Sequence, residues 1–200
     1  MTIPLADLVT ALPRRAGLPS VSWAHGNPEC LPGIEAITCD SRQVAPGSLF
    51  VAYPGVSVDG HDFVAQAVAK GAVAVVAEKR LEGLDVPLVV VPDGREALAY
   101  LSAAWHGFPS RQLTVVGDTG TDGKTTTCNL LHSILIAAGR CAGLVTTVNA
   151  VIGRRQMDTG LHTTTPDAPD MQRYLAEMVA AGMDTAVLEV TSHGLQQHRV

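Results

Sequence analysis

The chain has 200 residues, which is enough for one large domain or two small ones. Hydrophobic residues make up 46% of the chain and charged residues 16%, so it can bury a substantial core and is not expected to be disordered. The formal net charge is -5 and no basic run occurs, which argues against a nucleic-acid partner.

Membrane insertion and secretion are not indicated by the sequence. No apolar stretch is long enough to cross a bilayer, and the residues after Met1 lack the charged-then-apolar order of a signal peptide. We therefore expect a cytoplasmic protein without a membrane span. Aromatic residues make up only 4%, and Ala, Val and Leu dominate, which suits an α/β fold.

The first half of the chain alternates predicted helices and strands. Apolar periodicity, together with Gly and Pro breaks, sets the expected limits of each element. In chain order, we expect a helix at Pro4–Leu12, irregular chain up to Leu31, a strand running into a turn at Ile37–Arg42, a strand at Ser48–Ala52, a helix at Phe63–Lys70, strands at Ala72–Ala77 and Pro87–Val91, and a helix at Arg95–Trp105.

A break at Gly107–Ser110 separates this half from the next. It predicts a domain over residues 1–107, a linker over 108–112 and a second domain over 113–200. In the second domain we expect a short buried strand at Leu113–Val116, a helix from Lys124 to Ala138, a strand at Ala142–Thr147, a hairpin of Val148–Ile152 and Gln156–Leu161, a helix from Thr165 to Ala181 with Asp167 as N-cap, and a buried strand at Thr185–Val190.

A glycine-rich turn joins the strand at Leu113–Val116 to the following helix, and Lys124 and Thr125 open that helix. This order is typical of a phosphate-binding loop, in which backbone N–H groups and the positive end of the helix dipole surround phosphate oxygens. Lys124 would add a charge to the terminal phosphates, and Thr125 a hydroxyl to Mg²⁺. The usual spacing would put a glycine at position 118, which is Asp118 here, so a plain strand-to-helix connection remains an alternative.

The four cysteines (Cys30, Cys39, Cys128 and Cys141) show no C-x-x-C spacing. Buried reduced thiols are therefore favoured over a disulfide or a metal site. His193 and His198 lie close together, which is weak evidence for a metal site. Few strands follow residue 113, whereas a parallel nucleotide-binding sheet normally has about five or six, so we expect the second domain to be truncated.

Five segments, in this order, carry a resemblance to a known family. They are Asp40-Ser41-Arg42 with Pro46–Phe50, Asp59-Gly60-His61, Gly120–Thr126, Thr163-Thr164-Thr165-Pro166, and Glu189–Leu195 leading to Gln197–Val200. Together they resemble the Mur ligases of peptidoglycan synthesis. The last two segments are most similar to the branch of that family that adds the third stem amino acid.

The resemblance implies an N-terminal α/β domain that binds the UDP-linked substrate, followed by a phosphate-loop, parallel-sheet domain that binds ATP. It further implies a ligase that uses ATP and Mg²⁺ to join an amino acid to UDP-N-acetylmuramoyl-L-alanyl-D-glutamate through an acyl-phosphate. Its partners would be that UDP-sugar dipeptide and an amino acid, and we expect a monomer. The family's carbamylated lysine and its amino-acid-binding domain would lie beyond residue 200, so this chain alone should be inactive.

The resemblance also assigns site residues. ATP would be held by Gly120, Thr121, Asp122, Gly123, Lys124, Thr125 and Thr126, with Lys124 as the catalytic residue. Thr125 and Glu189 would hold Mg²⁺, because hard oxygen ligands suit that ion. Substrate contacts would come from Cys39, Ser41, Thr164, Thr165, Thr191, Gln197 and Arg199.

Several of these assignments have alternatives. Glu189 could be a surface carboxylate, and the polar substrate contacts, Ser41 above all, could be turn or capping residues. Asp118 and Asp122 put negative charge near the phosphates, where the family has an apolar residue and an asparagine. From other functional classes, a non-catalytic UDP-muramoyl- or nucleotide-binding module and a general phosphate-loop ATPase or kinase remain open.

Overall fold

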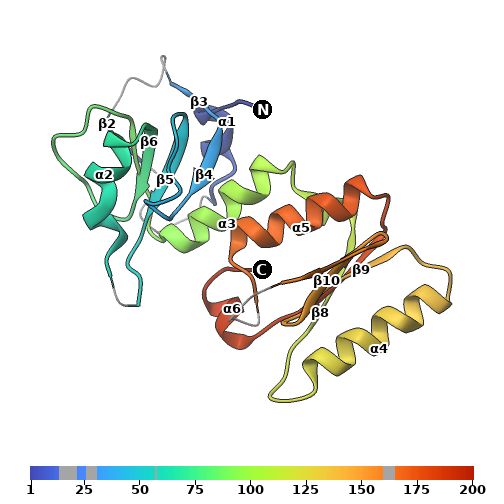
Figure 1. Ribbon diagram of the computed structural model, residues 1–200. Coiled ribbons are helices and arrows are strands. Elements are labelled where there is room, and N and C mark those ends of the chain that lie inside the picture. Colours follow the sequence, from blue (N-terminus) through green and yellow to red (C-terminus); the bar gives the residue numbers. More distant parts are fainter. Residues whose placement is uncertain (14–21, 26–30, 57, 160–164) are drawn as a thin grey trace. The chain divides into compact units, whose positions relative to one another are not determined.

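The computed structural model describes residues 1–13, 22–25, 31–56, 58–159 and 165–200 (Figure 1). The chain forms two compact units, residues 1–105 and 106–200. Each unit has its own five-stranded sheet and its own buried clusters. The α/β class expected from the sequence is confirmed. The predicted linker, 108–112, falls inside the second unit, where Pro109–Gln112 forms a 3-10 turn, η2.

The sheet of the first unit has the strand order β2-β7-β6-β5-β4. Four of its strands are parallel, and β2 joins the edge of β7 antiparallel. A separate two-stranded pair is formed by β1 and β3. The strands are β1 (Ile3–Pro4), β2 (Ser22–His25), β3 (Gly33–Ile34), β4 (Ala36–Thr38), β5 (Ser48–Ala52), β6 (Ala72–Ala77) and β7 (Leu88–Val90).

Helices cover both faces of this sheet (Figure 1). On one face, α1 (Leu5–Thr10) and α3 (Gly94–Trp105) pack with Leu49 and Val51. On the other, α2 (Val64–Ala69), which follows the 3-10 turn η1 (Gly60–Phe63), packs with Phe50 and Ala52. Because both faces are covered, all five residues of β5 are buried, as expected for a central parallel strand.

The sheet of the second unit has the order β11-β10-β9-β12-β8. Three strands are parallel, with β12 between β8 and β9, and an antiparallel hairpin extends the sheet beyond β9. The strands are β8 (Thr114–Asp118), β9 (Ala142–Val145), β10 (Asn149–Ile152), β11 (Arg155–Asp158) and β12 (Thr185–Glu189).

Two long helices lie on opposite faces of this second sheet (Figure 1). One face is covered by α4 (Lys124–Ala137) through Cys128, and the other by α5 (Ala168–Ala180) through Met171 and Met178. A short helix, α6 (Ser192–Gln196), follows β12. In such sheets ligands bind beyond the carboxyl ends of the strands, so residues 119–123 and Glu189 lie at the expected edge.

Most predicted elements are confirmed, and two details are wrong. The irregular stretch before Leu31 contains β2, which pairs with β7. The strand at Leu113–Val116 was expected to be buried, but β8 is an edge strand and most of its residues are exposed. Asp167 is the N-cap residue of α5, as predicted, although its side chain makes no capping hydrogen bond and its carboxylate lies 3.4 Å from Arg199 Nε.

The cysteines are reduced where they are described, but only Cys128 is buried. Cys39 is half-buried and Cys141 is exposed, so the expectation of buried thiols is wrong for these two; Cys30 lies outside the described residues. Among the helices that the structure describes, none has the length and apolar character that crossing a membrane requires.

Candidate nucleotide and UDP-sugar sites

The predicted phosphate loop connects β8 to α4. Gly123 has φ 78° and occupies the N-cap position of α4, a left-handed conformation that favours glycine. No side chain caps this helix end, which leaves the first-turn N–H groups directed at the loop. Lys124 Nζ donates to the carbonyl oxygens of Gly120 (2.9 Å) and Thr121 (3.1 Å). The ammonium therefore lies over the loop that would hold phosphate.

Next to the loop, Thr125 meets the buried carboxylate of Glu189. The Thr125 hydroxyl lies 3.0 Å from both carboxylate oxygens, and the backbone N–H of Thr147 donates to Oε2 at 3.0 Å. Glu189 is only 3% exposed, which rules out the alternative of a surface carboxylate. Sequence reasoning missed Thr147, although its place just after β9 puts it at the same sheet edge.

Asp118 shares this face of the sheet with Glu189. The two residues are partners in the parallel register of β8 and β12. Burial, and then the negative charges of Asp118 and Glu189, raise the pKa of the Cys128 thiol to about 11. The negative charge of Asp118 therefore acts on Cys128 of α4, close to the candidate phosphate site.

A hydroxyl and a buried carboxylate are donors that suit Mg²⁺, which takes few protein ligands and fills its shell with water and phosphate oxygens. The described residues contain no group of three or more His, Cys, Asp and Glu side chains arranged to hold a metal ion without such help. Thr125 and Glu189 would therefore need water and phosphate oxygens to complete the shell of such an ion, and His193 and His198 belong to no such group in the part of the chain that is described.

A second group of predicted contacts gathers around Thr165 in the same unit. Its hydroxyl accepts from the backbone N of Thr191 (3.1 Å) and lies 3.2 Å from the Thr191 hydroxyl, which caps α6 by accepting from Gly194 N. Arg199 Nη1 donates to Thr165 O at 2.8 Å, and Arg199 Nε donates to Gln197 Oε1 at 3.0 Å. These four predicted residues thus form one connected cluster, and Thr164 lies outside the described residues.

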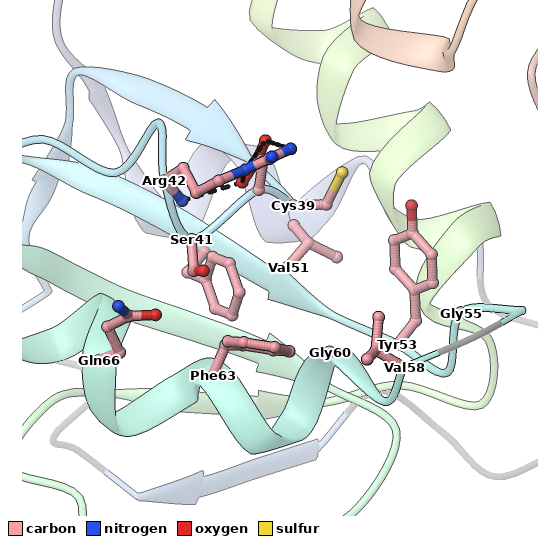
Figure 2. A pocket seen from close by; sticks show the side chains of 12 residues that line it. Cys39, Ser41, Arg42, Val51, Tyr53, Gly55, Val58, Gly60, Phe63 and Gln66 are labelled. Atoms are coloured by element: carbon pink, nitrogen blue, oxygen red, sulfur yellow. Dashed lines mark hydrogen bonds and ion pairs between the residues drawn. The ribbon is translucent and has the colours of Figure 1, made fainter.

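The first unit contains a cavity of about 650 Å³, a size typical of small-ligand sites (Figure 2). Its lining includes both predicted contacts of this unit, Cys39 and Ser41. The other lining residues come from the turn after β4, from β5 and the loop after it, and from η1 and α2: Asp40, Arg42, Phe50, Val51, Tyr53, Gly55, Val58, Gly60, Phe63 and Gln66. Sequence reasoning missed this second group, although the Asp59-Gly60-His61 segment marked the loop.

The turn that carries Ser41 is fixed by two independent contacts. Lys70 Nζ donates to Ser41 O at 2.8 Å. Asp40 accepts from the backbone N and the guanidinium of Arg42, and these hydrogen bonds hold the pKa of the Asp40 carboxyl below its usual value. The turn thus presents the Ser41 side chain to the cavity, opposite Phe63 and Gln66 on the helical wall (Figure 2).

Two family models match this chain. One is described as the Mur ligase family catalytic domain and matches residues 33–106, and the other as the Mur ligase middle domain and matches residues 119–200. These ranges contain the cavity of the first unit, and the phosphate loop and Glu189 of the second.

Curated relatives give the same result. The chain is 45% identical, over 96% of its length, to a UDP-N-acetylmuramoyl-L-alanyl-D-glutamate--2,6-diaminopimelate ligase of Geobacillus thermodenitrificans. It is 44% identical, over 98% of its length, to a UDP-N-acetylmuramyl-tripeptide synthetase of Deinococcus radiodurans. The chain spans only 38% and 39% of these two relatives, about two fifths of their length.

Solved structures agree with the sequence matches. One, described as a UDP-N-acetylmuramoyl-L-alanyl-D-glutamate--2,6-diaminopimelate ligase, aligns with the whole chain at a TM-score of 0.72 and 25% identity, over 38% of its own length. Another, a UDP-N-acetylmuramoylalanyl-D-glutamyl-2,6-diaminopimelate--D-alanyl-D-alanyl ligase from Acinetobacter baumannii, aligns with 96% of the chain at a TM-score of 0.61 and 26% identity, over 37% of its length. With domain models, curated relatives and solved structures in agreement, the chain belongs to the Mur ligase family.

Proposed function

We propose that this chain forms the UDP-sugar-binding and ATP-binding parts of a ligase that adds the third amino acid to UDP-N-acetylmuramoyl-L-alanyl-D-glutamate. The observation that carries the proposal is the contact of Thr125 with Glu189, a hydroxyl 3.0 Å from both oxygens of a buried carboxylate beside the phosphate loop. The names of the relatives support the substrate assignment.

In this proposal ATP supplies the phosphoryl group that activates the substrate carboxylate. Gly120–Gly123 and the first turn of α4 surround its phosphates with backbone N–H groups. Lys124, which contacts the carbonyl oxygens of Gly120 and Thr121 here, would instead pair with the terminal phosphate, a stronger partner for its charge. Thr125 and Glu189 would hold Mg²⁺, and that ion would reduce the repulsion between the phosphates and the substrate carboxylate.

We assign the cavity of the first unit to the uridine end of the UDP-sugar. Phe50, Tyr53 and Phe63 give it aromatic surface for a base, and Ser41 and Gln66 give it hydrogen-bonding groups. The cluster of Thr165, Thr191, Gln197 and Arg199 is assigned to the muramoyl part of the substrate. We also propose that the reaction takes place in the cytoplasm, where ATP is available.

Calorimetric titration with UDP-N-acetylmuramoyl-L-alanyl-D-glutamate and, separately, with ATP and Mg²⁺ tests this proposal. We expect the chain to bind both. Lys124→Ala should weaken ATP binding about 10- to 100-fold, the value of a hydrogen bond to a charged group, and leave UDP-sugar binding unchanged. Arg140→Ala is the matched control, because this cation of the same unit pairs with Asp184.

Each alternative gives a different result. A chain that binds ATP but ignores the UDP-sugar is a general phosphate-loop ATPase or kinase. A chain that binds the UDP-sugar but no ATP is a binding module. If Lys124→Ala binds ATP as the parent does, the phosphate loop has no role in nucleotide binding.

A further inference from the structure

His61 is almost fully buried beside the cavity of the first unit, and both of its ring nitrogens have a partner. The side chain is 3% exposed. Its Nδ1 lies 2.5 Å from Asp59 Oδ1, and the backbone N of Glu78, just after β6, lies 3.1 Å from its Nε2. A backbone N–H can only donate, so Nε2 accepts and the ring proton sits on Nδ1, which donates to Asp59. The contacts therefore select one neutral tautomer.

These contacts join the loop after β5, which forms one wall of the cavity, to the end of β6. Asp59 also accepts from the backbone N of His61 at 3.0 Å and from Lys79 Nζ at 3.1 Å. The hydrogen bonds from the backbone and ring of His61 hold the pKa of Asp59 well below its usual range. The loop is thus held by two sets of contacts, those of the buried His61 ring and the exposed ion pair of Lys79 with Asp59. The buried contacts are the stronger of the two, because solvent weakens an exposed ion pair.

The wall itself is a tight loop after β5. Gly55 N donates to Val58 O at 2.9 Å, and Gly60 N donates to Tyr53 O at 3.0 Å. A Cβ at Gly60 would lie 2.7 Å from Tyr53 O, so this close approach of the loop to the chain just after β5 requires glycine. Gly55, Val58 and Gly60 all line the cavity, as does Phe63 two residues after His61 (Figure 2).

We propose that His61 is a positioning residue for uridine binding, because its neutral ring holds both the loop wall (Gly55, Val58 and Gly60) and the start of the helical wall (Phe63) in place. The inference rests on the proposed uridine site in this cavity. His61 does not line the cavity itself and acts only through these neighbours. A ring that bridges two specific partners gives the wall one fixed position, which reduces the ordering that binding requires.

The Nε2 acceptor joins the loop to β6, because the backbone N of Glu78 donates to it at 3.1 Å. Glu78 is itself held in place, since its carboxylate accepts from Gly94 N at 2.8 Å, at the start of α3. Loss of the Nε2 acceptor should therefore weaken uridine binding.

The test is titration of the whole chain with uridine monophosphate, using Mg²⁺ and ATP as the reference ligand of the other unit. His61→Asn can still donate to Asp59 but leaves the N–H of Glu78 unpaired. We expect it to bind uridine monophosphate about tenfold more weakly, the cost of a buried unpaired donor, and ATP unchanged. His132→Gln is the matched control, since His132 also contacts a single backbone group, Ala142 O at 3.1 Å, in the second unit.

A second variant separates positioning from packing. His61→Gln offers Glu78 N an amide oxygen that does not titrate, so it should bind uridine monophosphate within about threefold of the parent. A role in folding alone would lower the unfolding temperature of the variants and leave the affinity of the folded chain for uridine monophosphate unchanged.

The outcomes are distinct. If His61→Asn binds uridine monophosphate within twofold of the parent, or if His61→Gln loses as much affinity as His61→Asn, His61 has no positioning role and the proposed function is untouched. If the parent chain binds no uridine monophosphate at all, the proposed function fails, and this inference fails with it.

Discussion

At the scale of single residues, Glu189 is the central residue of the candidate nucleotide site in the second unit. Its carboxylate is buried, and among the described residues its partners are the Thr125 hydroxyl and the backbone N–H of Thr147, which leaves acceptor capacity for a cation. Asp118, its register partner, brings a second negative charge to the same sheet edge. We expect opposite effects of the two carboxylates on ATP binding, because we propose that Glu189 holds Mg²⁺, whereas Asp118 would repel the phosphates.

Glu189→Gln should abolish most of the Mg²⁺ dependence of ATP binding. We expect ATP affinity in Mg²⁺ to fall about 10- to 100-fold, the usual loss when a metal site loses a supporting carboxylate, while affinity in EDTA stays the same. Calorimetry in both buffers measures this. Glu177→Gln on α5 is the control, since that carboxylate pairs with Arg155 and Arg173 away from the loop. An equal loss in both buffers would contradict a role in holding the ion.

Asp118→Asn should strengthen ATP binding. Removing a charge roughly 6 Å from a phosphate in a water-like dielectric is worth about 0.7 kcal/mol, or about threefold in affinity. The gain should shrink as salt rises, because exposed charges are screened. Titrations at low and high NaCl check this, with Asp170→Asn on α5 as the control. Weaker ATP binding by Asp118→Asn would instead mean that this carboxylate helps to hold Mg²⁺.

At the scale of elements, local sequence signals predicted the fold wherever a single segment determines its own structure. Apolar periodicity and a closing glycine gave α4 and α5, and Gly139 and Gly182 have the positive φ expected of helix ends. The exposure of β8 could not be predicted, because it depends on the strand order of the sheet. Similarly, β2 depends on the distant β7 as its pairing partner.

The same distinction applies to the candidate sites. Contiguous motifs predicted the phosphate loop and Ser41 as site residues. The apolar strand before Glu189 predicted its position at a strand end. The cavity as a whole was not predicted, since Ser41 and Phe63 come from separate segments that meet only through packing. The contact of Arg199 with the Asp167 carboxylate was not predicted for the same reason, because the two residues are 32 positions apart in the numbering.

Part of the apolar surface of α4 does not pack against the sheet of its own unit. On α4, Leu130 and Ile134 are 60% and 63% exposed, whereas Cys128 is buried. Leu130→Gln combined with Ile134→Gln should change the free energy of unfolding by no more than about 0.5 kcal/mol per site, as exposed substitutions do. If the chain self-associates through this exposed apolar face, the double substitution should reduce that self-association, measured by light scattering after size-exclusion chromatography.

A substitution at a buried residue of α5 serves as the comparison for the exposed residues of α4. Met171 of α5 is fully buried, so Met171→Ala should cost about 2–5 kcal/mol in denaturant unfolding. A comparable cost for the double substitution on α4 would show that its outer face is packed in solution. Unchanged self-association would show that Leu130 and Ile134 are not the surface responsible.

At the scale of the whole molecule, the two units have separate sheets and separate buried clusters, and the sites that we propose for uridine and for ATP lie in different units. A ligand stabilises what it binds by an amount set by its concentration relative to its dissociation constant, about 2.7 kcal/mol at a hundredfold excess. Uridine monophosphate should therefore stabilise residues 1–105, and Mg²⁺ with ATP should stabilise residues 106–200.

Hydrogen exchange of the whole chain resolves these two effects by segment. With uridine monophosphate, added protection should appear in β5 and β6, and with Mg²⁺ and ATP it should appear in β9 and β12, because exchange from core strands reports the opening of the unit that contains them. Lys124→Ala should lose only the second pattern and His61→Asn should reduce only the first. If either ligand protected the core strands of both units equally, the two units would unfold as one cooperative body, and single-unit binding energies could not be assigned from stability.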